Sequence, residues 1–158
     1  MSHAPSEPLD PVVRLHVLAA ALPGAVVAER VLAAPFDRVW RVVTDLEAMT
    51  PRYERNVSAV EVVDRQGERA RVIVTLRGGH SDAMDARILP GWCLMHSEST
   101  VVAFGARPMG PETVLAHLEF HRRSSVQPGG PPSDEAASKL VLELDTIELL
   151  ARELDVAR

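Results

Sequence analysis

Two polar side chains at the start of a predicted strand have the types and spacing of an acid/base pair. His80 and Asp82 are two residues apart and follow the Gly78-Gly79 turn. Residues i and i+2 of a strand lie on the same face, and this face continues with Met84, Ala86 and Ile88. The apolar continuation predicts that the face points inward, where the Asp82 carboxylate could orient the His80 imidazole for proton transfer. The alternative is a solvated hairpin end, since polar residues are common beside such turns.

The last predicted strand, residues 112–122, carries a second group of potentially reactive side chains. His117, Glu119 and His121 alternate along one face, and imidazole and carboxylate groups can bind zinc where the site is enclosed. Because an antiparallel sheet often has one dry and one wet face, we expect these three side chains to face solvent, and no metal site is predicted. The face expected to be dry carries Val114, Ala116, Leu118 and Phe120.

These side chains belong to a predicted antiparallel meander. Apolar and polar residues alternate in short segments separated by turn residues such as Gly67, Gly78-Gly79 and Pro90-Gly91. Sequential hairpins require an antiparallel sheet, and the dry face of such a sheet needs an apolar cover. The predicted strands are 25–32, 57–64, 68–77, 81–89, 92–98, 101–107 and 112–122.

Helices are predicted on both sides of this meander. Asp10 and Pro11 are suited to the start of a helix that spans residues 11–22. Pro35 begins a second helix, whose apolar stripe is Phe36, Val39, Trp40 and Val43. A Gly/Pro-rich connector at 124–133 precedes the longest helix, which is expected to turn Lys139, Glu143 and Arg152 away from its apolar face. That apolar face consists of Leu140, Val141, Leu144, Ile147, Ala151 and Leu154.

Only the last helix is large enough to cover the sheet, so the predicted fold class is α+β with a helix-grip architecture. A seven-stranded curved antiparallel sheet wraps a long C-terminal helix, two short helices follow the first strand, and an extra helix lies at the N-terminus. The predicted organisation is a flexible tail at 1–10, a helical extension at 11–23 and one domain at 24–158, within which 124–133 form a flexible loop.

Composition excludes several classes of function. The net charge is −5 at pH 7, and no cluster of Lys and Arg with interleaved aromatic residues indicates a nucleic-acid partner. Cys93 is the single cysteine, which excludes an internal disulfide and is typical of a cytoplasmic protein. No apolar run reaches the ~18 residues of a membrane span. Phosphate-binding glycine loops and the H-E-x-x-H motif are missing, and no cofactor is expected.

Residues 33–57, AAPFDRVWRVVTDLEAMTPRYERNV, carry a recognisable pattern: Ala-Pro, then Val-Trp, an Asp, a proline and an aromatic residue. This segment resembles the START-like (SRPBCC) superfamily, which includes aromatic polyketide cyclases, plant pathogenesis-related proteins and lipid-transfer domains. The resemblance covers about residues 25–155. It implies an apolar cavity between the sheet and the last helix that binds a hydrophobic or aromatic small molecule, and in some members this cavity folds and dehydrates a substrate.

The candidate site residues follow from the strand faces and from this resemblance. Tyr53 matches the aromatic position that lies near the cavity entrance in the superfamily. Arg107 would be informative if buried, because an unpaired guanidinium in an apolar cavity calls for an anionic or enolate partner; it could equally be solvated at a strand end. The candidate catalytic residues are His80, Asp82 and Arg107, and the candidate ligand-binding residues are Tyr53, Met84, Trp92, His96, Phe104, Leu140 and Leu144.

Three functions are compatible with the sequence. The first is binding of an aromatic, polyketide-like or lipid-like small molecule. The second is a cofactor-independent cyclase or aromatase, in which Tyr53, His80, Asp82 or Arg107 moves protons during ring closure. The third is a module that binds a protein segment or a quinone-like lipid. A homodimer is a further possibility, and the 11–22 helix has no assigned role.

Overall fold

The computed structural model describes residues 8–122 and 134–156. The predicted connector at 124–133 and most of the predicted tail at 1–10 lie outside these residues. The elements in chain order are α1 (Pro11–Ala20), β1 (Val26–Leu32), α2 (Phe36–Thr44), α3 (Leu46–Tyr53), β2 (Val57–Gln66), β3 (Arg69–Leu76), β4 (Ser81–Leu89), β5 (Trp92–His96), β6 (Thr100–Met109), β7 (Glu112–His121) and α4 (Asp134–Val156).

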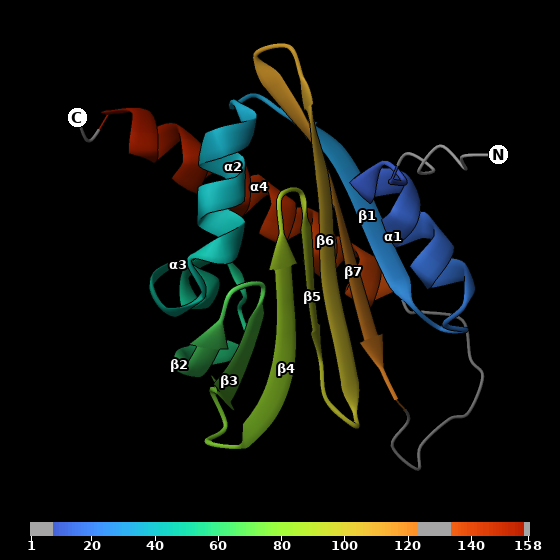
Figure 1. Ribbon diagram of the computed structural model, residues 1–158, viewed down its shortest axis with the longest axis vertical. Coiled ribbons are helices and arrows are strands. Elements are labelled where there is room, and N and C mark those ends of the chain that lie inside the picture. The colour runs from blue at the N-terminus through green and yellow to red at the C-terminus, as the bar shows by residue number, and fades with distance from the viewer. Residues whose placement is uncertain (1–7, 123–133, 157–158) are drawn as a thin grey trace, which may run out of the picture.

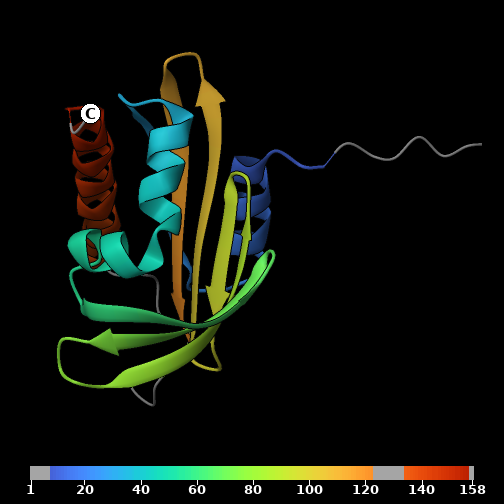
Figure 2. The same ribbon diagram turned by 60° about the vertical axis from the view of Figure 1, so that its left-hand side comes forward.

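The described strands form one antiparallel sheet with the order β1-β7-β6-β5-β4-β3-β2 (Figure 1). Hairpins connect β2 to β7 in succession, and β1 pairs with β7 at the far edge, with Val26 opposite Glu119 and Leu32 opposite Thr113. Figure 2 shows the curvature of the sheet, with α2, α3 and α4 on one side and α1 on the other. The predicted α+β helix-grip fold is confirmed.

The inner face of the sheet packs against α2, α3 and α4. Leu144, Ile147 and Ala151 of α4 are fully buried and belong to the same apolar cluster as Val39 and Val43 of α2. Burial of one such aliphatic side chain contributes about 1.5–3 kcal/mol. The long helix therefore covers the dry face of the sheet, as the sequence predicts. In the described part of the chain, no helix combines the length and the apolarity of a membrane span.

The outer face of the sheet is covered by α1, which forms a second apolar cluster. Asp10 caps this helix by accepting a hydrogen bond from the Val12 N–H at 2.9 Å. Gly105 of β6 lies directly under the helix: a Cβ atom there would come within 2.3 Å of the carbonyl oxygen of Pro11. The helix therefore contacts the backbone of the sheet itself. The buried members of this outer cluster are Val12, Leu15, Trp92, Ala103, Val114, Ala116 and Leu118.

The burial of both faces of β7 corrects one expectation. His117 and Glu119 were predicted to face solvent, but their residues are only 0% and 9% exposed. The apolar face of β7 is indeed dry because α1 covers it, and this leaves the polar face to point into the interior toward α4. Of the three polar residues, His121 alone is exposed, at the end of the strand.

Candidate functional site

A cavity of about 210 Å³ lies between the inner face of the sheet and the helices α3 and α4. Its apolar part includes Tyr53, Met84, Met95 and Phe104. The polar side chains on its wall are contributed by several elements: Glu54 directly follows α3, His80 and Asp82 lie at the start of β4, Glu119 and His121 lie on β7, and Lys139 lies on α4.

Five of the predicted site residues meet at this cavity. Tyr53, His80, Asp82, Met84 and Phe104 all contribute to its wall. Met84 is 4% exposed, and the next residue on its face, Ala86, is equally buried, in agreement with the inward face predicted for β4. The alternation of apolar residues after the Gly78-Gly79 turn was therefore sufficient to identify this part of the wall.

The hydrogen bond of Asp82 differs from the one the acid/base hypothesis invokes. Its Oδ2 accepts a hydrogen bond from the Ser97 hydroxyl at 2.7 Å. His80 is exposed next to the turn. The two side chains share the cavity wall, but in this structure Asp82 is oriented by Ser97. Their role in proton transfer stays a prediction.

The other candidate residues lie elsewhere in the described structure. Trp92 packs on the outer face of the sheet, and the guanidinium of Arg14 lies 4.3 Å from the centre of its ring. His96 is exposed on β5. The side chain of Arg107 is 44% exposed and lies 3.5 Å from an oxygen of Asp10, which matches the solvated alternative. Leu140 and Leu144 are fully buried on α4 but do not reach the cavity wall among the described residues.

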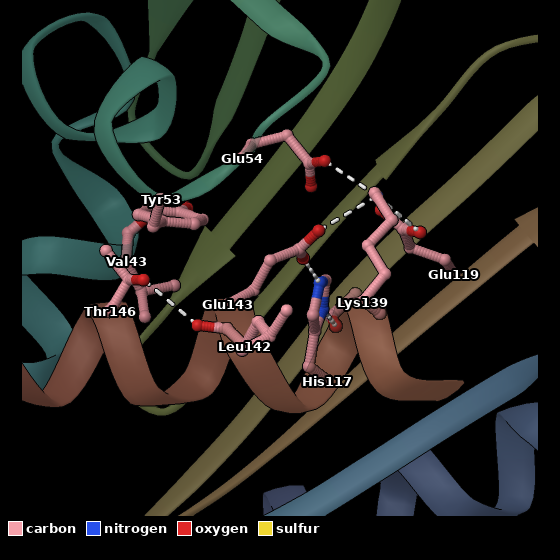
Figure 3. A network of polar contacts seen from close by, with 10 residues as sticks. Val43, Tyr53, Glu54, His117, Glu119, Lys139, Leu142, Glu143 and Thr146 are labelled. Carbon is pink, nitrogen blue, oxygen red and sulfur yellow. Dashed lines mark hydrogen bonds and ion pairs between the residues drawn. The ribbon is translucent and has the colours of Figure 1, made fainter. Parts of the chain in front are cut away.

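At the polar end of the cavity, the ammonium group of Lys139 is surrounded by three carboxyl groups (Figure 3). Its Nζ donates to Glu54 Oε1 at 2.7 Å and to the two oxygens of Glu119 at 2.9 and 3.0 Å. It also forms an ion pair of 2.8 Å with Glu143 Oε1, one helical turn along α4. Three carboxyl oxygens thus accept hydrogen bonds from one ammonium, and Glu143 Oε1 contacts it as an ion pair without a hydrogen bond.

Glu143 connects this lysine to a buried histidine. Its Oε2 lies 2.8 Å from His117 Nε2, and His117 Nδ1 lies 3.1 Å from the carbonyl oxygen of Ala103. A carbonyl and an ionised carboxylate are both acceptors, so both contacts are hydrogen bonds only when both ring nitrogens carry a hydrogen. The imidazole also stacks on Phe104, with ring centres 4.0 Å apart. The ring of Phe104 is also in edge contact with the ring of Tyr53, and their centres are 6.0 Å apart.

We define the buried cluster as Glu54, His117, Glu119, Lys139 and Glu143. Within it, the pKa of Glu54 and the pKa of Glu143 are shifted in opposite directions. Burial, together with the nearby carboxylates of Glu119 and Glu143, raises the pKa of Glu54 to about 9. Burial alone would also raise the pKa of Glu143, but its hydrogen bond with His117 and the charge of Lys139 lower the pKa below its ordinary value. At neutral pH Glu54 is therefore a neutral carboxylic acid and Glu143 a carboxylate.

Lys139 stays charged despite its partial burial. Desolvation would lower its pKa, but the carboxyl groups of Glu119 and Glu54 outweigh this effect and raise the pKa above its ordinary value. Burial likewise raises the pKa of Tyr53, so its phenol is a neutral group on the cavity wall. The hydroxyl of Tyr53 donates to the Val43 carbonyl oxygen at 3.5 Å, so the polar end of the cavity consists of the Lys139 cation, the Glu119 carboxylate and the neutral acid of Glu54.

The sequence analysis assigned Lys139 and Glu143 to the solvent side of the last helix, and this was wrong. Glu143 is 1% exposed, whereas Val141, which was predicted to be buried, is 40% exposed. The helical spacing did contain a signal: residue 143 is three positions after Leu140 and four before Ile147, both fully buried. A charged residue at a core position of a helix indicates a buried partner, and only the fold shows that the partners come from β7 and the end of α3.

Comparison with known proteins identifies the fold. A protein from Thermus thermophilus matches with a TM-score of 0.64 and 21% identity, over 85% of this chain and 99% of its own. A START superfamily protein from Mycobacterium smegmatis matches at 0.60 and 19%, over 82% and 98%. The Zhui aromatase/cyclase from Streptomyces sp. R1128 matches at 0.57 and 18%, over 81% and 93%. The chain has the START-like fold.

The similarity to these proteins was found by comparing structures and not by comparing sequences. No protein-family model matches the sequence, and no curated protein matches it significantly. At 18–21% identity, the similarity to the three solved structures establishes the START-like fold, while the chemistry of the site has to be argued from its own residues.

Within the START-like domain, the buried cluster also has the composition of a metal site. Ligand atoms of Glu54, His117, Glu119 and Glu143 all lie within 4.8 Å of one another. However, Lys139 contacts all three of the carboxyl groups. In this structure its ammonium provides the positive charge that a bound metal ion would otherwise supply.

Proposed function

We propose that this protein binds a small, largely apolar molecule, aromatic or polyketide-like in character, in the cavity between the sheet and α4. The observation that carries this proposal is the cavity itself, with an apolar wall that includes Met84, Met95 and Phe104 and a polar end at Glu54 and Lys139. Apolar pockets with a few convergent polar groups are the usual form of a small-molecule site. The apolar wall supplies affinity, and the polar end fixes the orientation of the ligand.

The size of the cavity restricts the ligand. About 210 Å³ is less than the ~300–1,000 Å³ that encloses a drug-sized molecule. A compact one- or two-ring molecule suits this volume better than a long acyl chain. The aromatic rings of Tyr53 and Phe104 on the wall offer stacking and edge contacts to such a ring. The aromatic class of ligand is therefore favoured over the lipid-like class.

Titration with 1-naphthol tests the binding function. We expect chemical-shift changes in a ¹H–¹⁵N spectrum at residues of the cavity wall, and weaker binding in Met84→Trp, in which a bulky ring fills the cavity. Met109→Trp places the same ring at a position that is 39% exposed and away from the cavity, and it should bind like the unmodified protein. Shift changes that avoid the cavity, or equal affinity of the two variants, would contradict the proposal.

A cofactor-independent cyclase is the second candidate, because acid and base groups occupy the same wall. The pKa of Glu54 is close to 9, so this acid holds a proton at neutral pH, and perturbed acids in a cavity are candidates for catalysis. In an aldol ring closure, a base such as His80 removes a proton next to one carbonyl and the resulting carbanion attacks a second carbonyl. This new C–C bond closes the ring, Glu54 gives its proton to the alkoxide, and the hydroxyl then leaves with an α-hydrogen as water to form the conjugated double bond.

Heptane-2,6-dione tests this chemistry, because its intramolecular aldol condensation gives 3-methylcyclohex-2-enone and water. We expect the protein to accelerate formation of the conjugated enone, measured by ultraviolet absorbance, and we expect His80→Ala to reduce the rate. His96→Ala removes an exposed histidine that does not line the cavity and should leave the rate unchanged. A rate equal to that in buffer would limit the function to binding.

A further inference from the structure

Glu54 offers the cavity a carboxyl oxygen that is not paired within the cluster. It is 8% exposed and lines the cavity. Its Oε1 accepts the hydrogen bond from Lys139, and among the described residues its Oε2 has no hydrogen-bond partner. On the wall of a cavity, such an oxygen can pair with a ligand or with solvent.

The charges of the cluster balance when this carboxyl group is a neutral acid. The ammonium of Lys139 has three hydrogens for four carboxyl oxygens, and the imidazole of His117 serves Glu143. With both nitrogens of His117 protonated, two cations balance two carboxylates. The third carboxyl group completes a neutral cluster only as the acid. Of the three, Glu54 and Glu119 line the cavity, and Glu119 already has both oxygens on Lys139.

We propose that the neutral carboxylic acid of Glu54 donates a hydrogen bond to a carbonyl oxygen of the ligand, so that the cavity selects neutral ketones over anionic molecules. This inference rests on the proposed function and specifies the ligand class for the same cavity.

The groups that face Glu54 maintain this acid. Glu119 and His117 belong to β7, and Lys139 and Glu143 belong to α4. Burial first, and then the two neighbouring carboxylates, raise the pKa of Glu54 to about 9, against the opposing charge of Lys139. On the same cavity wall, His80 just before β4, Asp82 of β4 and His121 of β7 are further titratable groups. A carboxylic acid kept neutral by its site is an effective hydrogen-bond donor to a carbonyl that develops negative charge.

The same arrangement rejects anions. A carboxylate ligand would be desolvated next to Glu119 and Glu143, and the hydrogens of Lys139 are already donated to Glu54 and to both oxygens of Glu119. Among the described residues of the cavity wall there is no Arg and no Lys besides Lys139, so the like charges disfavour binding. A ketone needs only one donor, and Glu54 supplies it.

Acetophenone, ethylbenzene and benzoate test this selectivity, since they share one ring and differ in the group attached to it. Affinities are measured from ¹H–¹⁵N shift changes between pH 6 and pH 10. At pH 7 we expect acetophenone to bind and benzoate to bind at least tenfold more weakly. The ratio of acetophenone affinity to ethylbenzene affinity should fall about three- to tenfold in Glu54→Leu, which is the value of one net hydrogen bond.

Glu54→Gln keeps a hydrogen-bond donor at this position but removes the group that loses its proton as the pH rises. The amide still donates a hydrogen bond and still accepts one from Lys139, so the ketone preference should persist. In the unmodified protein this preference should disappear above about pH 9, at the pKa of Glu54, whereas in Glu54→Gln it should remain at pH 10. Glu61→Gln, on the exposed side of β2, is the matched control and should behave like the unmodified protein.

Two different failures are distinguishable. If ethylbenzene and acetophenone both fail to perturb the cavity residues, the proposed binding function itself fails. If both bind but their affinity ratio is unchanged in Glu54→Leu, or if benzoate binds as tightly as acetophenone, the cavity binds apolar rings without the Glu54 donor, and the inference is overturned while the binding function stands.

Discussion

Replacing Lys139 by methionine removes the ammonium group that contacts all three carboxyl groups of the cluster. In the structure the lysine side chain is 23% exposed, and its nitrogen lies 2.7–3.0 Å from four carboxyl oxygens. Methionine is similar in length and fills the same space, so the change mainly removes the charge. Glu119 then loses its compensating cation in a largely buried environment, and Glu143 is left with His117 alone.

The expected loss is about 3–5 kcal/mol at pH 7, which is the usual cost of removing one partner of a buried ion pair. A domain of this size has a total stability of about 5–15 kcal/mol. Since 1 kcal/mol shifts Tm by about 2–4 °C in proteins of 150–250 residues, Tm should fall by about 6–20 °C. Urea denaturation followed by circular dichroism at 222 nm would measure the loss.

The pH dependence of this loss provides a second readout. Without the lysine, the buried carboxylates are held less strongly in their charged form and take up protons as the pH falls. The folded variant then binds more protons than the unfolded chain, so its stability relative to the unmodified protein is highest at acidic pH and decreases as the pH rises. The deficit of Lys139→Met should therefore be smaller at pH 5 than at pH 8.

Arg52→Met is the matched control, because it removes a cation from an exposed pair with Glu153 whose side chains are 53% and 66% exposed. Such pairs contribute about 0–1 kcal/mol. If Lys139→Met lost less than about 1 kcal/mol, or no more than this control, the cluster would not hold uncompensated charge, and the argument for a neutral Glu54 would fail with it.

Three further predictions address separate contacts. Gly105→Ala should cost about 1–3 kcal/mol by overpacking, because its Cβ would lie 2.3 Å from the Pro11 carbonyl oxygen; an unchanged urea midpoint would show that α1 does not need this close contact. Glu54 keeps its proton up to about pH 9 in the folded protein but loses it near pH 4.5 in the unfolded chain, so the free energy of unfolding should fall as the pH rises across this range. The fall should be less steep in Glu54→Gln. Parallel profiles of urea stability against pH for the two proteins would disprove the raised pKa. His117 should show hydrogens on both ring nitrogens in ¹⁵N spectra at pH 7, and a single protonated nitrogen would refute the charge count of the cluster.

Local sequence signals were sufficient to predict the bounds of an element where its turn or cap residues are unambiguous. Strand β4 spans Ser81–Leu89 as predicted, because Gly78-Gly79 and Pro90-Gly91 delimit it on both sides. Asp10 caps α1 as predicted, since the side chain and the following proline specify a helix start by their own chemistry. Such features depend on neighbours in the chain, and the sequence contains those neighbours.

The candidate site was predictable on the side of the meander and not on the side of the last helix. Met84 and Phe104, two of the candidate ligand-binding residues, line the cavity, and their role in binding stays a prediction. Arg107 and Trp92 were attractive by type, but Arg107 pairs with Asp10 near the exposed end of β6, and Trp92 faces α1. Which face of a strand is inner depends on what covers the other face, and α1 covers the outer face of β5, β6 and β7.

The sequence by itself determined the helix-grip fold class, because period-two alternation, turn residues and one long amphipathic helix leave few ways to bury the apolar surface. Tertiary structure alone decided where charge is buried. Glu54, Glu119 and Lys139 come from the end of α3, from β7 and from α4, and their ionisation depends on distances and solvent exclusion that exist only after these elements pack together.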